Sequence, residues 1–152
     1  AVDGRCHLAP DAAMVERIAA ILDEVRPDTV LTFGPDGFTG HLDHVAVGSW
    51  TLRALRQAYP TGAGPRVLWP CVRRSWVERY GELNRRFGVF GTDGPPVVDD
   101  ADLAVVVQPG FVTTERKMAA LRAHRSQTAE LMRCAGPATY RRWWRDEVFI
   151  AA

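Results

Sequence analysis

Hydrophobic residues recur along this chain with two periods, which together predict alternating helices and strands. In four stretches apolar residues return every three or four positions, the spacing of a helix with one buried face. These predicted helices cover residues 10–26, 45–58, 73–87 and 113–134. Shorter runs of apolar and β-branched residues predict strands at residues 29–33, 66–69 and 103–107, and a last edge strand at 147–151. This alternation favours an α/β fold, for which we expect a Rossmann-like, mainly parallel sheet flanked by helices.

Glycine, proline and threonine residues mark where these elements begin, end or approach one another. Pro70 is expected to stop the second strand, and Thr113 or Thr114 to cap the last long helix. Gly48 weakens its helix slightly, but it permits a close approach to the sheet. In the last long helix, His124 shares a face with apolar residues at spacings of three and four. We therefore expect His124 to face inward or into a cleft.

The densest group of titratable side chains directly follows the first predicted strand. Asp36, His41, Asp43 and His44 fall within nine residues, and open α/β sheets place their chemistry at the carboxyl ends of strands. The two histidines are three residues apart, so one turn of helix can aim both rings at one point. Asp43 can orient a ring through its N–H, or it can cap a helix that begins at His44. Asp36 precedes a glycine and is by itself a strong turn signal.

The overall composition describes one globular domain over residues 1–152, with 47% hydrophobic residues and a formal net charge of +1. This charge argues against a nucleic-acid partner, so the aromatic and basic segment 140–145 is interpreted as an amphipathic packing segment. No run of 18 apolar residues is present, so we expect no membrane association and a cytoplasmic location. The three widely spaced cysteines predict reduced thiols and no zinc knuckle. His7 is expected on the surface of an N-terminal loop.

Two segments resemble signatures of the PIG-L/LmbE-like zinc N-deacetylases. Residues 33–37 (Phe-Gly-Pro-Asp-Gly) and 40–44 (Gly-His-Leu-Asp-His) resemble the second motif of that family, and residues 117–127 resemble its C-terminal helix signature. The resemblance covers most of residues 10–133. The first motif of the family, His-Pro-Asp-Asp-Glu, is absent from this sequence. The chain therefore resembles the C-terminal part of such an enzyme, and of a larger α/β domain.

The resemblance implies a role for each residue of the polar cluster. His44 is expected to be a zinc ligand, and His41 with Asp43 to stabilise the oxyanion or protonate the leaving amine. Asp36 and His124 are expected to contact the substrate. The implied reaction is zinc-dependent removal of an N-acetyl or other N-acyl group from an amino sugar or a related small glycoconjugate. The general base and two further zinc ligands belong to the absent first motif.

Two alternatives remain open at the level of the sequence. One histidine cannot hold catalytic zinc without two more donors, so the chain can be a catalytically incomplete relative that needs a partner segment. A missing N-terminal segment or another subunit of a homo-oligomer would then complete the metal site. The other alternative is a Rossmann-type nucleotide binder, although the sequence has neither a G-x-G-x-x-G stretch nor a P-loop.

Overall fold

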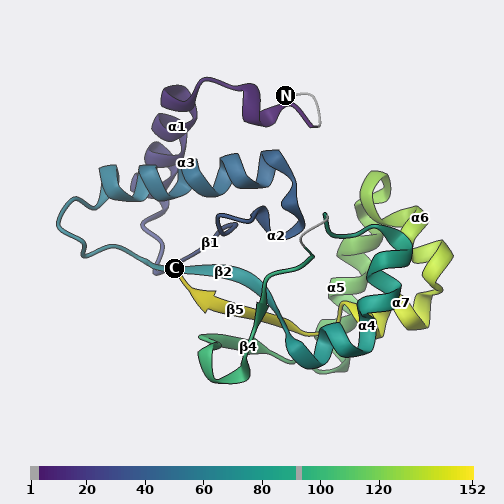
Figure 1. Cartoon of the computed structure of the whole chain (residues 1–152). Coiled ribbons are helices and arrows are strands. Elements are labelled where there is room, and N and C mark those ends of the chain that lie inside the picture. Colours follow the sequence, from purple (N-terminus) through teal and green to yellow (C-terminus); the bar gives the residue numbers. More distant parts are fainter. Residues whose placement is uncertain (1–3, 92–93) are drawn as a thin grey trace.

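A five-stranded sheet forms the centre of the computed structural model, which describes residues 4–91 and 94–152 (Figure 1). The strand order is β1-β2-β5-β4, with β3 beside the second half of β2. The strands are β1 (Thr29–Leu31), β2 (Arg66–Arg73), β3 (Val97–Val98), β4 (Val105–Val107) and β5 (Glu147–Ala151). Strands β1 and β3 run parallel to β2, whereas β5 is antiparallel to both β2 and β4.

The α/β fold class is thus confirmed, but the sheet is mixed rather than mainly parallel. Val107 at the end of β4 pairs with Glu147 at the start of β5. Strand β5 therefore begins where β4 ends and runs back beside it, which makes the pair antiparallel. The expectation that residues 147–151 form an edge strand is also wrong, because β5 lies between β2 and β4.

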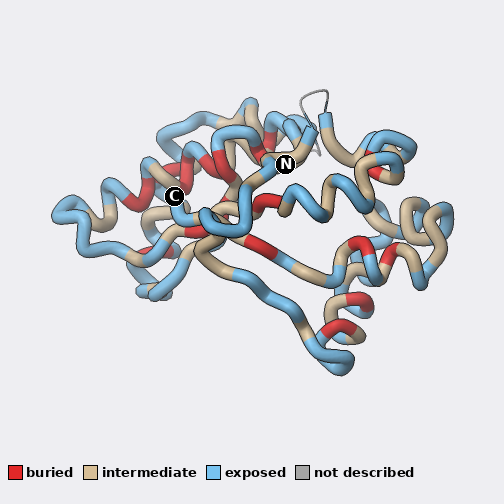
Figure 2. Tube along the Cα trace, turned by 60° about the horizontal axis from the view of Figure 1, so that its bottom comes forward, coloured by how far each residue is buried: buried red, intermediate tan, exposed pale blue. Residues whose placement is uncertain are grey.

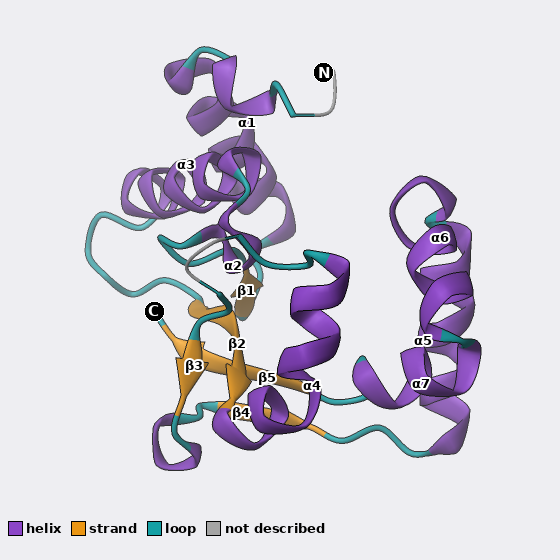
Figure 3. Ribbon diagram, turned by 45° about the vertical axis from the view of Figure 1, so that its right-hand side comes forward, coloured by secondary structure: helices purple, strands orange, loops and turns teal. Residues whose placement is uncertain are grey.

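The described residues form seven α-helices around the sheet, and all but α2 fall into two groups (Figures 1 and 3). They are α1 (Asp11–Val25), α2 (Gly37–Gly40), α3 (Leu42–Ala58), α4 (Arg74–Phe87), α5 (Phe111–Ala123), α6 (Arg125–Ala135) and α7 (Pro137–Trp143), and short 3-10 turns cover Cys6–Leu8 and Asp100–Asp102. Helices α1 and α3 pack together near β1 and β2, whereas α4 to α7 gather on the other side of the molecule. Among the described residues, no helix is long and apolar enough to cross a membrane.

Each helix group has its own hydrophobic core (Figure 2). The first core joins α1 and α3 through Leu22 and Trp50, and Val30 of β1 packs against it. The second core joins α4 to α7 around Trp143, whose side chain is fully buried. The Trp143 indole N–H donates to Asn84 Oδ1 at 3.1 Å, so its polar atom is satisfied inside the core. The interpretation of segment 140–145 as a packing segment is confirmed at Trp143 and Tyr140.

The expected long helix at 113–134 is divided into α5 and α6 at His124, where ψ is +55°. The hydroxyl of Thr128 donates to the carbonyl oxygens of Leu121 and His124. The His124 carbonyl also accepts from the backbone N–H groups of Gln127 and Thr128, and the Leu121 carbonyl accepts from that of His124. These bonds close the end of α5 and the first turn of α6. Helix α5 also begins earlier than expected, at Phe111 after Gly110, so neither expected threonine is its cap.

Strand β2 continues through Pro70, contrary to the expectation that it stops there. Strand β1 pairs with β2 only as far as Leu68, and β3 pairs from Val72 onward. The Leu68 carbonyl and the Val72 N–H form hydrogen bonds on the side of β2 that faces β1 and β3. By alternation the Pro70 nitrogen points to the same side, into the gap between β1 and β3. Its missing N–H therefore breaks no ladder bond.

Candidate functional site

The candidate site lies where β1 ends and the chain passes through the α2 loop into α3. Strands β1 and β2 are parallel, so both deliver their following loops to the same edge of the sheet. Helix α2 lies between the end of β1 and the start of α3 (Figure 3). His41 and His44 follow at the beginning of α3, and their ring centroids are 5.0 Å apart. The prediction that one turn brings both rings together is confirmed.

His44 is held in one orientation by contacts on one ring nitrogen and one ring face. Its Nδ1 lies 3.0 Å from the carbonyl oxygen of Gly37 and 3.1 Å from Thr39 Oγ1. A carbonyl only accepts hydrogen bonds, so Nδ1 must carry the proton. The ring also stacks in parallel on Phe33, with centroids 4.1 Å apart. The lone pair of the neutral ring is therefore on Nε2, the arrangement by which a backbone carbonyl orients a metal-binding histidine.

Two glycines allow this packing around His44. Gly37, whose carbonyl accepts from His44, has φ +67°, and a Cβ there would lie 2.8 Å from Val45 Cγ2. Gly48 lies one turn beyond His44 on α3, and a Cβ there would lie 2.4 Å from the carbonyl oxygen of Phe33. The prediction that Gly48 permits a close approach of helix to sheet is confirmed. Side chains at either position would separate α3 from the end of β1.

His41 is the N-cap residue of α3, and its Nδ1 accepts a hydrogen bond from the backbone N–H of Asp43 at 3.1 Å. Because the lone pair of Nδ1 is used in this way, the proton of the neutral ring is on Nε2. The His41 side chain is exposed, so this N–H is available to a ligand. The alternative in which Asp43 caps a helix beginning at His44 is wrong, because α3 begins at Leu42.

The carboxylate of Asp43 is bound by His7. Asp43 Oδ1 accepts from the backbone N–H of His7 at 2.8 Å and lies 2.7 Å from the His7 ring Nδ1. The hydrogen bond from the His7 backbone is the main cause that lowers the pKa of Asp43 to about 2, so the carboxylate is ionised at neutral pH. Among the described residues no hydrogen bond joins this carboxylate to the His41 ring, so Asp43 does not orient that ring as expected.

His7 is a residue of the site that sequence reasoning missed. It was expected on the surface of an N-terminal loop, but it lies in the 3-10 turn Cys6–Leu8 and is partly buried against the start of α3. It is 36 positions before Asp43. No periodicity or motif links the two residues, so only the tertiary structure shows the contact.

The two expected substrate contacts lie in different places. Asp36 is exposed and accepts a hydrogen bond from the backbone N–H of Phe38, which makes it the cap of α2. This agrees with the turn signal around it. His124 is exposed at the junction of α5 and α6, so the prediction that it faces inward or into a cleft is wrong. Contact of either residue with substrate stays a prediction.

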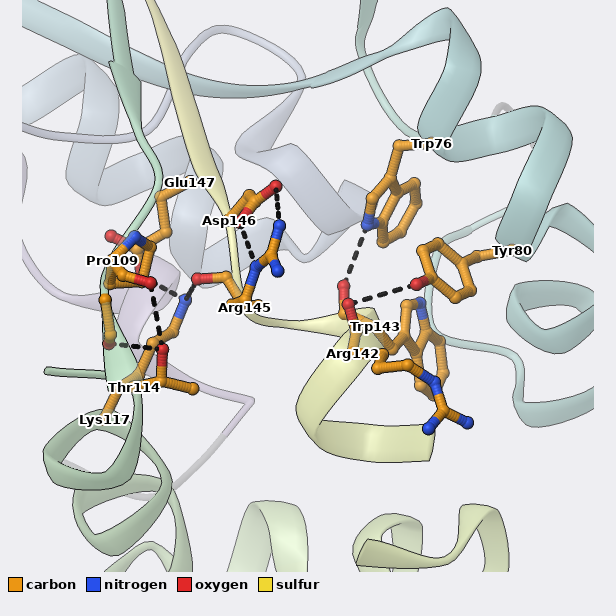
Figure 4. Close-up of polar contacts among 11 residues, drawn as sticks. Trp76, Tyr80, Pro109, Thr114, Lys117, Arg142, Trp143, Arg145, Asp146 and Glu147 are labelled. Carbon is orange, nitrogen blue, oxygen red and sulfur yellow. Dashed lines mark hydrogen bonds and ion pairs between the residues drawn. The ribbon is translucent and has the colours of Figure 1, made fainter. Parts of the chain in front are cut away.

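A hollow of about 610 Å³ extends from the α2 loop toward the second helix group. It begins at Leu31 and Phe38, next to the histidine loop, and it passes between the second half of β2, β5, α4 and α7. Trp76, Tyr80 and Trp144 line it with aromatic rings. In Figure 4, the Trp76 indole N–H donates to the carbonyl oxygen of Trp143 at 2.9 Å, and the Tyr80 hydroxyl donates to that of Arg142 at 3.1 Å. These two rings are therefore held in place.

The opposite wall of this hollow carries charged groups, most of them in pairs. Lys117 Nζ lies 2.7 Å from Glu147 Oε1, and Arg145 Nε donates to Asp146 Oδ1 at 2.6 Å (Figure 4). The indole N–H of Trp144 is buried and has no hydrogen-bond partner among the described residues. Aromatic walls with a few converging polar groups are typical of small-molecule pockets. From the sequence, these aromatic residues were recognised only as apolar positions of predicted packing segments.

The described residues do not bring a complete set of metal ligands together. Across residues 4–91 and 94–152, no group of three or more His, Cys, Asp or Glu side chains could hold a metal ion. The ring of His44 fits a metal ligand, because Nδ1 is tied to a carbonyl and Nε2 has its lone pair. Asp43, the nearest carboxylate on α3, is engaged by His7. The described residues thus form no complete metal site.

The amino-acid sequence of the chain is similar to proteins named as deacetylases. No protein-family model matches the chain. The chain is 38% identical to a 1D-myo-inositol 2-acetamido-2-deoxy-alpha-D-glucopyranoside deacetylase of Kineococcus radiotolerans, in an alignment covering 90% of the chain and 42% of that protein. Proteins of the same name from Tsukamurella paurometabola and Rhodococcus jostii are 34% and 31% identical, over 76% and 84% of the chain and 42% and 48% of their own lengths. The chain thus spans less than half the length of these curated relatives.

Proposed function

We propose that this chain is part of a PIG-L/LmbE-like N-deacetylase that hydrolyses the amide of an N-acetylated amino sugar. The orientation of His44 is the observation that carries the proposal. Its Nε2 lone pair is directed by a carbonyl contact on Nδ1 and a stacked ring, and it lies at the carboxyl end of a parallel strand. The similarity to three proteins named as deacetylases of a 2-acetamido sugar supports the same conclusion.

The proposed metal is zinc, with His44 Nε2 as one ligand. Bound zinc would polarise the amide carbonyl and lower the pKa of a water molecule. The Gly37 carbonyl and the Phe33 ring would hold the His44 side chain in its metal-binding orientation. This side chain would therefore need little reorientation when the metal binds. Two further ligands and the general base would come from outside the described part of the chain, because residues 4–91 and 94–152 hold no three-ligand group.

His41 is proposed to stabilise the negative charge that develops on the amide oxygen. Its Nε2–H is exposed, while its Nδ1 is held by the backbone of Asp43. A fixed N–H directed at a developing oxyanion stabilises the transition state more than the ground state. Asp43 would act as a positioning residue, because its backbone N–H holds His41 and its carboxylate anchors the start of α3 to His7.

The hollow beside the histidine loop is the proposed place for the rest of the substrate. Phe38 joins the hollow to the loop, and Trp76 and Tyr80 offer fixed aromatic faces to the apolar side of a sugar ring. The charged groups on the opposite wall can bond to hydroxyl groups. This arrangement fits a glycoside with a polar substituent.

A two-part measurement tests the proposal. The chain would be combined with the part of the Kineococcus radiotolerans protein that lies outside the matched stretch. Zinc content and release of a free amine from an N-acetylglucosaminyl-inositol would be measured. The mixture is expected to bind zinc and to turn over, whereas the chain alone binds no zinc tightly. The absence of tight zinc binding by the chain alone is also what the alternative of a catalytically incomplete chain predicts.

Two substitutions separate the proposed roles. His44→Ala is expected to abolish both zinc retention and turnover. His41→Ala is expected to keep zinc but to lower kcat by about 10²–10³-fold, as for loss of one oxyanion donor. Cys134→Ser serves as a control for metal held by an exposed thiol, and it should change neither quantity. Retention of zinc by the His44→Ala mixture would refute the proposed site.

A further inference from the structure

The hollow between β2, β5, α4 and α7 is lined by more cationic than anionic side chains. Its cationic lining residues are Arg73, Arg79, Lys117, Arg142 and Arg145, and its anionic lining residues are Asp146 and Glu147. Both carboxylates are already paired with cations of the same lining, and Arg73 Nε lies 3.6 Å from Asp100 Oδ1. Arg79 and Arg142 have no carboxylate partner among the described residues. Their positive charges are therefore available to a ligand of opposite charge.

The same lining contains two buried N–H groups that lack an acceptor. Arg73 Nε and Trp144 Nε1 are buried and make no hydrogen bond among the described residues. Both groups can only donate, and a buried donor without an acceptor is unfavourable. No buried side-chain acceptor of the described lining is left without a partner. A ligand that satisfies this hollow must therefore supply acceptor oxygens.

Arg79 and Arg142 belong to two helices that are hydrogen-bonded to each other. Tyr80, the residue after Arg79 on α4, donates from its hydroxyl to the carbonyl oxygen of Arg142 on α7 at 3.1 Å (Figure 4). Trp76, one turn earlier on α4, donates to the carbonyl oxygen of Trp143 at 2.9 Å. The backbones that carry the two arginines are thus fixed relative to each other. An anion that contacts both guanidinium groups has to order only their exposed side chains.

The distribution of charge along the sequence favours an anion in the same region. Most of the 19 Lys and Arg residues follow position 72, whereas the 18 Asp and Glu residues are divided almost evenly between the two sides of that position. Helices α4 to α7 all follow position 72. The second helix group therefore has a positive field that attracts anions toward the hollow.

We propose that this hollow binds an anionic substituent of the substrate, a phosphate monoester or a carboxylate, so that the substrate is an acidic derivative of an N-acetylated amino sugar. This inference rests on the proposed function and names its substrate class. Arg79 and Arg142 bind the anionic oxygens through charge-assisted hydrogen bonds. The hollow begins at Leu31 and Phe38 beside the histidine loop, so one molecule can reach both His44 and the two arginines. The substrate in the relatives' name is an inositol glycoside without an acidic group, and this chain differs from them in that preference.

The test measures binding to the chain without metal. Titration calorimetry would compare three α-linked sugars, namely N-acetylglucosamine 1-phosphate, the N-acetylglucosaminide of glycolate, and the neutral methyl N-acetylglucosaminide. At least one acidic sugar is expected to bind about tenfold or more tightly than the neutral sugar. The sugar that binds more tightly identifies the substituent as phosphate or carboxylate. Added salt should reduce this advantage, because it screens charges that are partly exposed.

Two double variants show whether the advantage comes from the hollow. Arg79→Gln with Arg142→Gln should abolish it, whereas the corresponding lysine pair, which keeps both charges, should retain part of it. Arg122→Gln with Arg125→Gln is the matched control, because both residues are exposed, belong to the same helix group and lie outside the lining. This control has the same change in net charge and should keep the advantage.

Equal affinity for the acidic and neutral sugars would overturn the inference, as would equal loss in the two glutamine pairs. A failure of the proposed function gives a different pattern. Preferred binding of an acidic sugar, together with no amine release by the complete mixture, would refute the deacetylase but keep the anion site. Turnover of acidic and neutral sugars with equal kcat/KM would do the reverse.

Discussion

Gly48→Ala is the sharpest test of how α3 is held against the end of β1. A Cβ at position 48 would lie 2.4 Å from the carbonyl oxygen of Phe33 and 3.4 Å from that of Gly34. The contact with Phe33 is about 1 Å shorter than van der Waals contact, and both atoms belong to backbone. Overpacking of this kind costs about 1–3 kcal/mol, whereas replacing a helical glycine by alanine gains about 1 kcal/mol. We therefore expect a net loss of about 1 kcal/mol in the free energy of unfolding.

Gly81→Ala in α4 is the matched control for this substitution. The nearest atoms to a Cβ there are Arg85 Nη1 at 3.6 Å and Val77 Cγ1 at 3.7 Å. Only the gain in helix propensity applies, so this variant should be more stable by up to about 1 kcal/mol. Urea unfolding of the two variants would give changes of opposite sign. If both variants were stabilised equally, the close packing of α3 on β1 would be refuted.

Two further predictions concern Asp43 and Trp143. The pKa of Asp43 is lowered from 3.8 to about 2, so its contribution to stability is present above pH 4 and is lost as the pH falls toward 2. Asp43→Asn should therefore have a lower free energy of unfolding than the wild type at pH 6. In urea unfolding this difference in free energy should become smaller by pH 2.5. A difference that stays constant with pH would contradict the lowered pKa of Asp43. Trp143→Ala should lower the free energy of unfolding by about 3–5 kcal/mol, since the side chain is fully buried. A change within about 0.5 kcal/mol, as for a surface substitution, would refute its place in the core.

The parts of the fold that the sequence could predict are those set by local pattern. The periodicity of residues 10–26, 45–58 and 73–87 predicted α1, α3 and α4 closely. The strand before the histidine loop was predicted for the same reason. The break at His124 could not be predicted, because residues 113–134 contain no glycine or proline to mark it.

The remaining differences come from contacts between distant segments. Pro70 remains in β2 because its nitrogen faces the gap between β1 and β3. Strand β5 is internal because it inserts between β2 and β4. At the site, spacing predicted that His41 and His44 converge, but the partner of Asp43 is His7, far away in sequence. Local spacing thus places the two histidine rings and their hydrogen bonds, whereas a tertiary contact decides the partner of the Asp43 carboxylate.

The protonation pattern of the His44 ring tests the central claim most directly. Two-bond ¹H–¹⁵N correlation spectra of the chain, with His44 assigned by the His44→Ala variant, identify which nitrogen of the neutral ring carries the proton. The structure predicts a protonated Nδ1, held by the Gly37 carbonyl at 3.0 Å, and an unprotonated Nε2 that shifts when zinc is added to the complete mixture. A neutral His44 ring protonated at Nε2 would contradict the account, because the lone pair would then be on Nδ1, which faces the Gly37 carbonyl instead of the proposed metal position.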